Sequence, residues 1–271
     1  MQIYIHFYYP PKENYKKWFC KFTTFNNVMN LIIDVGNTFV KLAVFEGDNI
    51  VCKKSIELKF ILKHIDLLKK EYKSIKKAII SSVGKLKTAD VDDIKKFFDL
   101  VHLDSETKLP FINCYETPKT LGLDRIALVC AAIQQFPKSN VLVIDAGTCI
   151  TYDFVTSDSN YLGGAISPGV RMRYRSLHNL TANLPLLESE IPKSIIGNST
   201  NNSIHSGVIF GILNEIDGVI CQYKEKYKDL TVILTGGDAN FLSKQLKSSI
   251  FANSNFLLEG LNYIIQINSN E

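Results

Sequence analysis

A duplicated turn is the feature that most constrains the fold of this chain. The stretches LIIDVGNTFVKLAVF and LVIDAGTCITYDFV share one pattern: an apolar strand, an Asp-x-Gly turn and a second strand. Asp34 and Gly36 of the first copy match Asp145 and Gly147 of the second, both at a separation of 111 residues. Further strand and helix patterns follow each copy. The repeat therefore predicts an α/β protein with two domains of related topology that face each other across a cleft.

The length agrees with this division. A chain of 271 residues suits two domains of roughly 100–150 residues each. We expect the first domain at residues 29–140 and the second at residues 141–271. Residues 1–28 contain the only tryptophan, many aromatic residues and a Pro-Pro pair, and no apolar stretch long enough for a signal peptide. The hypotheses for them are a non-native or disordered extension ahead of a start at Met29, or an interaction arm.

The composition is that of an ordinary soluble protein. Hydrophobic residues make up 46% and charged residues 21%, and the formal net charge is only +4. Because the lysines are scattered along surface patterns, solvated helix faces explain them better than nucleic-acid binding does. No apolar run reaches the ~20 residues of a membrane helix. The six cysteines are dispersed and form no Cys-x-x-Cys pair, which disfavours zinc and indicates reduced thiols in the cytoplasm.

The two turns have the chemistry of a nucleotide phosphate site. Glycine lets the backbone approach a ligand closely, and amide N–H groups with hydroxyls such as Thr38 and Thr148 can bind phosphate oxygens. Asp34 and Asp145 can contribute to a Mg²⁺ site, because Mg²⁺ prefers a few carboxylates with phosphate oxygens and water. Neither a Walker loop nor Gly-x-Gly-x-x-Gly occurs.

A third glycine motif follows later in the chain. VILTGGDANFL is an apolar strand that ends in Thr-Gly-Gly-Asp before a helical pattern. Gly236 and Gly237 would let the main chain lie against a flat ligand such as adenosine. A Gly-Gly pair alone is usually only a turn, but here it is the third member of an ordered series.

In this order, the motifs resemble the type III pantothenate kinase family, of the acetate and sugar kinase/Hsc70/actin superfamily. The resemblance extends over about residues 29–265, and GLDR and GGAISPG are its most specific parts. The matching motifs are DVGNT (34–38), GLDR (122–125), DAGT (145–148), GGAISPG (163–169) and LTGGD (234–238).

The resemblance implies two RNase H-like (actin-like ATPase) domains and ATP-dependent phosphorylation of pantothenate, the first step of coenzyme A biosynthesis. It also implies Mg²⁺ with ATP, a monovalent cation (K⁺ or NH₄⁺), a cytoplasmic homodimer, and no nucleic-acid or membrane partner. Asp124 matches the family's general base and Asp145 its monovalent-cation ligand. The implied ATP-binding residues are Asp34, Val35, Gly36, Asn37, Thr38, Phe39, Val40, Lys41 and Thr148. The implied substrate-binding residues are Tyr115, Gly122, Leu123, Asp124, Arg125 and Thr200.

Arginine usage gives separate support from within the chain. There are only four arginines, all in or just after the GLDR and GGAISPG motifs: Arg125, Arg171, Arg173 and Arg175. A guanidinium binds carboxylate or phosphate through a planar fork that lysine lacks. Arg125 is therefore a natural anchor for the carboxylate of pantothenate.

Structural and functional alternatives stay open at this point. Asp124 could be an N-terminal helix cap, Asp145 a turn residue and Thr200 a helix-entry hydroxyl. The chain could also be a non-catalytic transcription accessory factor of the same family, or a sugar kinase of the same superfamily. Three retained carboxylates argue against the first, and GLDR with GGAISPG argues against the second.

Overall fold

The computed structural model describes residues 28–36, 39–82, 86–101 and 107–269. Residues 1–27 of the predicted extension, and Asn37 and Thr38 of the first turn, lie outside this part. The strands are β1 (Met29–Val35), β2 (Val40–Glu46), β3 (Asn49–Ile56), β4 (Ile75–Ser82), β5 (Asp99–Val101), β6 (Ile112–Asn113), β7 (Asn140–Ala146), β8 (Cys149–Val155), β9 (Asn160–Pro168), β10 (Leu230–Thr235) and β11 (Phe251–Ala252). The α-helices are α1 (Ile61–Glu71), α2 (Thr88–Phe97), α3 (Leu123–Gln135), α4 (Val170–Asn179), α5 (Thr200–Lys226), α6 (Ala239–Ser243) and α7 (Phe256–Ile267). Two 3₁₀ turns, η2 (Leu58–Phe60) and η3 (Pro118–Thr120), complete the elements.

The strands form two sheets with the same order and directions. The first sheet runs β3-β2-β1-β4-β5, and the second runs β9-β8-β7-β10-β11 with β6 added at the β9 edge. In each sheet the central strand pairs antiparallel with the strand that follows it and parallel with a strand reached through helices. The repeat predicted from the two Asp-x-Gly stretches therefore extends over five strands.

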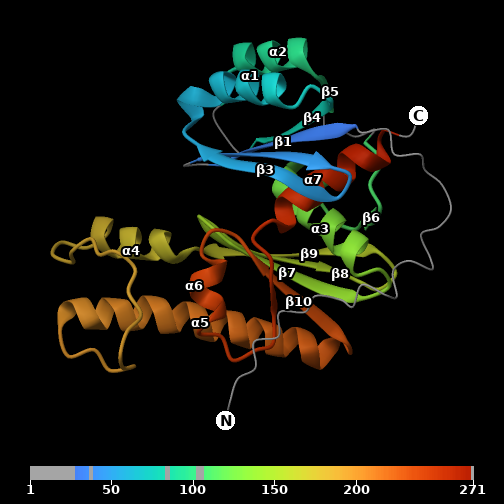
Figure 1. The fold of residues 1–271 in the computed structure, drawn as a ribbon. Coiled ribbons are helices and arrows are strands. Elements are labelled where there is room, and N and C mark those ends of the chain that lie inside the picture. The colour runs from blue at the N-terminus through green and yellow to red at the C-terminus, as the bar shows by residue number, and fades with distance from the viewer. Residues whose placement is uncertain (1–27, 37–38, 83–85, 102–106, 270–271) are drawn as a thin grey trace.

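Helices separate and cover the sheets in layers (Figure 1). Helices α1 and α2 cover the outer face of the first sheet, and α4, α5 and α6 cover the outer face of the second. Helices α3 and α7 lie between the sheets, where Ile32 and Ile79 of one and Val143 and Ile233 of the other join a single central core. Because both faces of the central strands are covered, β1 and β7 are almost continuously apolar.

Strand β6 and helix α7 each pack against a sheet formed by the other half of the chain. The strand β6 precedes residue 140 but is hydrogen-bonded to β9 of the second sheet. Helix α7, at the other end of the chain, contacts β1 and β4, and Asn262 Oδ1 accepts a buried hydrogen bond of 2.9 Å from Asn30 Nδ2. Strand β7 begins at residue 140, where we expected the domain boundary, and that boundary stays a prediction.

Helix α5 is apolar because it covers a sheet. Among the described residues it is the one helix long and apolar enough to cross a membrane by length and composition. Half of its most apolar stretch is buried, and it packs with α4 on the outer face of β10. Core helices of soluble proteins have the same properties, so its packing accounts for its composition.

The contact between α3 and α7 depends on a glycine. A Cβ atom added to Gly260 of α7 would lie 1.9 Å from the carbonyl oxygen of Ala127 in α3. We expect Gly260→Ala to lower the free energy of unfolding by about 1–3 kcal/mol through overpacking, measured by urea denaturation.

Gly218 of α5 provides the matched control, because it is exposed and a Cβ there meets no atom within 4 Å. Gly218→Ala should be neutral or stabilising by up to ~1 kcal/mol, since alanine favours the helix. Equal effects of the two substitutions would contradict this account of the packing.

Candidate active site

Asp34 and Asp145 occupy equivalent places at the ends of the two central strands. Side chains alternate between the faces of a strand, so Asp34 shares the face of Ile32, and Asp145 that of Val143. Ile32 and Val143 both belong to the core between the sheets. The two carboxylates therefore extend from facing surfaces toward the space between the sheets, as the repeat predicts.

The turns after the two aspartates differ in length. Residues 36–39 connect β1 to β2, and the amide of Gly36 donates to the carbonyl of Phe39 at 3.1 Å. Residues 147–148 connect β7 to β8, and the amide of Gly147 donates to the carbonyl of Cys149 at 2.9 Å. The Asp-x-Gly core of the motif is thus shared, while the first turn has more backbone that can wrap a ligand.

Lys41 is the cation beside the first turn. Its Nζ lies 3.7 Å from Asp34 Oδ2, and the Asp34 side chain is only 6% exposed. Burial raises the pKa of Asp34, Lys41 counteracts this, and the negative charge of Asp124 raises it again. The carboxylates of Asp34 in the first turn and Asp124 at the start of α3 therefore repel each other.

Asp145 interacts with the same charged groups. Burial raises the pKa of Asp145 to about 7; Lys41 opposes the shift, while Asp124, Asp34 and Asp153 add to it. Three predicted site carboxylates, from β1, α3 and β7, are thus close enough to interact, and Lys41 is the opposite charge that acts on Asp34 and Asp145. A cation bound here would relieve their repulsion.

The arrangement suits a metal that is held largely by a substrate. Among the described residues, no group of three His, Cys, Asp or Glu side chains is arranged to hold an ion by itself. Mg²⁺ commonly takes only one or two carboxylates and completes its shell with phosphate oxygens and water. Asp34 and Asp145 therefore suit a metal that takes one or two ligands from the protein better than a metal that is coordinated by protein ligands alone.

Two glycine motifs pack against the second turn. A Cβ on Gly236 would lie 2.3 Å from Asp145 Oδ1, and a Cβ on Gly169 would lie 2.2 Å from the carbonyl oxygen of Gly147. Gly236 also has φ +96°, which favours glycine. The amide of Asp238 donates to the carbonyl of Ala146 at 2.9 Å. The structure thus brings the TGGD and SPG segments to the DAGT turn.

The GLDR segment forms the start of α3. Gly122 is at the N-cap position, so Asp124 is a first-turn residue and not the cap itself. Asp124 Oδ1 accepts a hydrogen bond of 2.8 Å from the backbone amide of Arg125. A Cβ on Gly122 would lie 2.3 Å from this oxygen, so the glycine leaves room for the carboxylate in this position. The helix N-terminus favours the negative charge there.

Arg125 lies beside Tyr115 at the same end of α3. Its guanidinium carbon is 5.4 Å from the centre of the Tyr115 ring. Tyr115 is partly exposed and stacks on the buried Tyr161, with ring centres 6.2 Å apart. Two predicted substrate residues, distant in sequence, therefore form one surface.

The other residues predicted to bind ATP have mixed exposure. Val35 and Val40 point their side chains into the core of the first sheet, so only their backbone could contact a nucleotide. Phe39 is half exposed, and Thr148 is exposed in the second turn.

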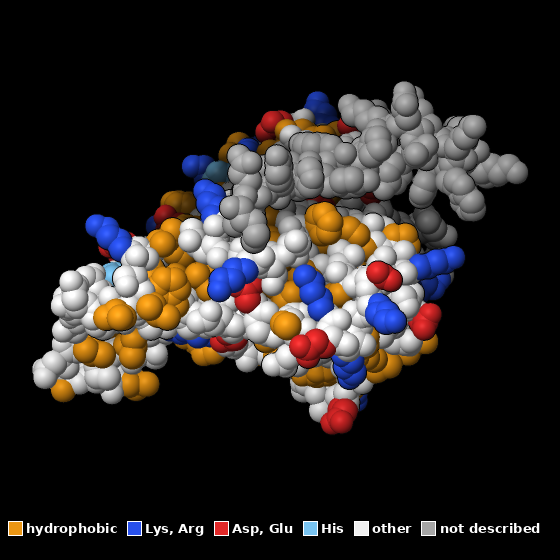
Figure 2. All heavy atoms as spheres, turned by 90° about the horizontal axis from the view of Figure 1, so that it is seen from below, with side chains coloured by type: hydrophobic (Ala, Val, Ile, Leu, Met, Phe, Trp, Pro, Cys, Tyr) orange, Lys and Arg blue, Asp and Glu red, His pale blue; other side chains and the backbone are white. Residues whose placement is uncertain are grey.

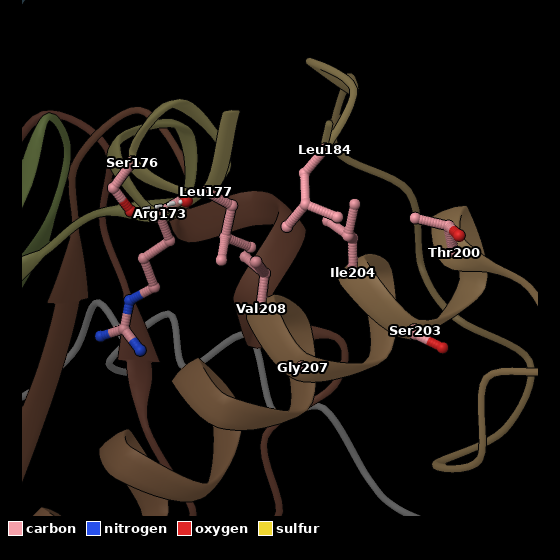
Figure 3. A pocket seen from close by; sticks show the side chains of 9 residues that line it. All are labelled: Arg173, Ser176, Leu177, Leu184, Thr200, Ser203, Ile204, Gly207 and Val208. Carbon is pink, nitrogen blue, oxygen red and sulfur yellow. Dashed lines mark hydrogen bonds between the residues drawn. The ribbon is translucent and has the colours of Figure 1, made fainter. Parts of the chain in front are cut away.

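Thr200 lies apart from this cluster. It is the first residue of α5, whose cap is Ser199: the Ser199 hydroxyl accepts from the amide of Asn202. No hydrogen bond or ion pair within the described part of the chain joins Thr200 to the acidic cluster. Figure 3 shows it at one end of a groove between α4 and α5. The groove is lined by Arg173, Ser176, Leu177, Leu184, Thr200, Ser203, Ile204, Gly207 and Val208.

The sequence reading missed Asp153. This residue is fully buried in β8, where it faces Arg125. A carboxylate inside the apolar run TYDFV was the available signal, because a buried charge requires a partner. Ser81 was also missed: it pairs in register with Asp34, and its buried hydroxyl has no partner among the described residues.

Comparison with known proteins identifies the family. A family model described as type III pantothenate kinase matches residues 30–222. The chain belongs to the type III pantothenate kinase family. A type III pantothenate kinase of Christiangramia forsetii is 52% identical over 243 residues, which is 90% of this chain and 100% of the relative. That of Flavobacterium johnsoniae is 49% identical over 238 residues, covering 88% of this chain and 98% of the relative.

Solved structures with low identity share the fold. A Campylobacter jejuni protein described as a Baf family transcriptional activator has a TM-score of 0.58 at 22% identity, covering 89% of this chain and all of that one. A Listeria monocytogenes protein described as an N-acetylmannosamine kinase has a TM-score of 0.54 at 13% identity, covering 90% and 100%. The chain therefore shares its mixed α/β fold with both of these structures.

The carboxylate cluster makes stability depend on pH. Because the pKa of Asp145 is raised above the ~3.9 of an unfolded aspartate, the folded state holds the proton more tightly than the unfolded state does. Stability from this group is therefore lost as pH rises from about 4 to about 7. We expect Asp145→Asn to melt at a higher temperature than wild type at neutral pH, in chelator and without nucleotide.

The decisive result of this melting experiment is how Tm depends on pH in the variant and in wild type. The difference in Tm between Asp145→Asn and wild type should grow across that pH window. A Tm difference that stays constant, or that shrinks as pH rises, would contradict the raised pKa of Asp145 in the carboxylate cluster.

Proposed function

We propose that this chain catalyses the ATP-dependent phosphorylation of pantothenate to 4′-phosphopantothenate, the first step of coenzyme A biosynthesis. The observation that carries the proposal is the cluster of Asp34, Asp124 and Asp145 with Lys41, built from two equivalent turns and a helix start in a member of this family. Phosphoryl transfer depends mainly on positioning and on charge stabilisation, which such a cluster provides.

Asp124 is the general base in this proposal. The primary hydroxyl oxygen of pantothenate forms a bond to the γ-phosphorus of ATP, and the bond from that phosphorus to the β–γ bridging oxygen breaks. The hydroxyl proton passes to Asp124, and ADP leaves. The carboxylate stands at the start of α3, where it accepts a hydrogen bond from the Arg125 amide and where Gly122 leaves room for it.

The first turn binds the phosphates of ATP. Its members are Asp34, Val35, Gly36, Asn37, Thr38, Phe39, Val40 and Lys41, with Thr148 of the second turn opposite. Mg²⁺, when bound with ATP, would neutralise phosphate charge, and Asp34 is the carboxylate that would hold it. Lys41 holds Asp34 oriented and adds positive charge beside the phosphates.

Asp145 is the ligand of a monovalent cation, K⁺ or NH₄⁺. Its burial and three neighbouring carboxylates favour a cation at this position. Asp145 would hold this cation, whose charge would offset the repulsion among the carboxylates.

Pantothenate binds at the start of α3. Gly122, Leu123, Asp124 and Arg125 line one side and Tyr115 the other, with the substrate carboxylate on the Arg125 guanidinium. Two RNase H-like, actin-like ATPase domains then enclose the nucleotide and the substrate. The two sheets of identical strand order support that description.

Thr200 reaches a substrate only through a second subunit in this proposal. Six exposed apolar side chains lie on α4 and on the segment between α4 and α5, and Figure 2 shows hydrophobic atoms on this end of the molecule. They are Met172, Leu180, Leu186, Ile191, Ile195 and Ile196. Such a patch indicates a protein interface, and a homodimer in the cytoplasm is the assembly that we propose.

The function is tested by measuring ADP release with Mg-ATP and pantothenate, in K⁺ and then in Na⁺ buffer. We expect pantothenate-dependent turnover that is faster in K⁺. Asp124→Asn should lower kcat by about 10²–10⁴-fold, since it removes the general base.

Asp92→Asn is the control for Asp124→Asn, because Asp92 is exposed on α2, where its carboxylate lies 3.8 Å from Lys95 Nζ. No turnover of pantothenate by folded wild-type protein in any salt would overturn the proposed function and favour a binding protein. Turnover that requires a hexose in place of pantothenate would favour a sugar kinase.

The proposed dimer gives a separate prediction. Ile195 and Ile196 are 70% and 78% exposed, and Ile195→Asp with Ile196→Asp should convert the dimer to monomer in sedimentation velocity. Leu67→Asp on α1, at the opposite side of the fold, should leave the mass unchanged. A wild-type chain that sediments as a monomer at every concentration would contradict the dimer.

A further inference from the structure

The Arg125 guanidinium is buried and only partly satisfied. The residue is 5% exposed, and its Nε donates to Asp153 Oδ1 at 2.7 Å. Its Nη2 is buried and has no hydrogen-bond partner in the described ranges of the chain. An unpaired buried N–H of a charged group is costly, so an acceptor at Nη2 would stabilise the folded protein.

Asp153 is held by three donors on two strands and a helix. In addition to Arg125 Nε, Tyr161 OH donates to Oδ1 at 2.7 Å and Thr151 Oγ1 donates to Oδ2 at 3.1 Å. Asp153 and Tyr161 are fully buried, so this arrangement is rigid. Burial, the largest single effect, lowers the pKa of Arg125, but the charge of Asp153, the neighbouring Tyr161 and hydrogen bonds to Asp153 and Tyr115 together raise it more, which keeps the guanidinium protonated.

The same tyrosine also supports the other substrate residue. Tyr161 stacks beneath Tyr115 with an angle of 25° between the rings. On another side of Tyr115 lies Gly163, at φ +97°, where a Cβ would be 3.1 Å from the ring. Tyr161 therefore fixes Tyr115 by stacking and Arg125 through Asp153.

We propose that Asp153 and Tyr161 are positioning residues that hold the Nη edge of Arg125 toward the carboxylate of the substrate. The inference rests on the proposed function and adds residues outside the family-like motifs. An Arg fork that is fixed on one side by a buried carboxylate presents its remaining N–H groups in one direction. Without Asp153 the guanidinium would be free to turn toward the acidic cluster of Asp34, Asp124 and Asp145.

The test compares pantothenate with its neutral analogue, in which a hydroxymethyl group replaces the carboxylate. For Tyr161→Phe we expect KM for pantothenate to rise about 3- to 10-fold, and for Asp153→Asn about 10- to 100-fold, because one hydrogen bond to a charged group is lost or misdirected. The kcat, KM for ATP and kcat/KM for the neutral analogue should stay within about twofold, because the carboxylate is remote from the reacting hydroxyl.

Tyr152→Phe is the matched control. Tyr152 is also buried, precedes Asp153 in β8, and donates its hydroxyl to a different carboxylate, Glu215, at 2.9 Å. This variant should keep the wild-type ratio of pantothenate to neutral-analogue turnover. Loss of that ratio in Tyr161→Phe and not in Tyr152→Phe supports the inference.

The outcomes separate the inference from the proposed function. If wild type does not phosphorylate pantothenate, the proposed function fails. If wild type is active but Tyr161→Phe raises KM for both substrates equally, or raises KM for ATP instead, the positioning role is overturned. Should Asp153→Asn fail to fold, since it leaves a buried arginine unpaired, Tyr161→Phe alone decides the question.

Discussion

The repulsion among carboxylates that are wholly or partly buried is the constraint on which the rest of the site depends. Asp34 and Asp145 stand at the last inward-facing positions of two equivalent strands, and Asp124 joins them from the start of α3. Burial of like charges is unfavourable unless cations or donors compensate. Lys41 supplies one compensating charge, and a site of this kind remains ready for a metal and a polyanion.

The fold is built from one arrangement of five strands that occurs twice. Two sheets of the same order place their central strands face to face, and α3 and α7 fill the space between them. Gly260 allows those helices to approach, and Gly236 and Gly169 bring later motifs onto the second turn. The glycines thus act at the contacts between elements, where a single methyl group would collide with backbone.

Much of this could be read from the sequence, and the exceptions have physical reasons. The Asp-x-Gly copies predicted the paired turns because a strand, a turn and a strand are local in sequence. The return of α7 to the first sheet and the pairing of β6 with β9 are long-range contacts with no local pattern. Asp153 escaped notice because its partner, Arg125, is 28 residues earlier, and only the fold brings the two together. Thr200 lies at the start of α5 with no hydrogen bond or ion pair to the cluster in the described part of the chain, so its proposed role requires the proposed dimer, which a single sequence does not display.

The most direct measurement is a crystal structure of the chain with pantothenate, Mg²⁺ and a non-hydrolysable ATP analogue. This account predicts that the phosphates lie between the turns of Asp34 and Asp145, and that the primary hydroxyl of pantothenate lies about 2.6–3.2 Å from an oxygen of Asp124. It also predicts the pantothenate carboxylate on Arg125. A nucleotide bound elsewhere, or a pantothenate hydroxyl far from Asp124, would contradict it.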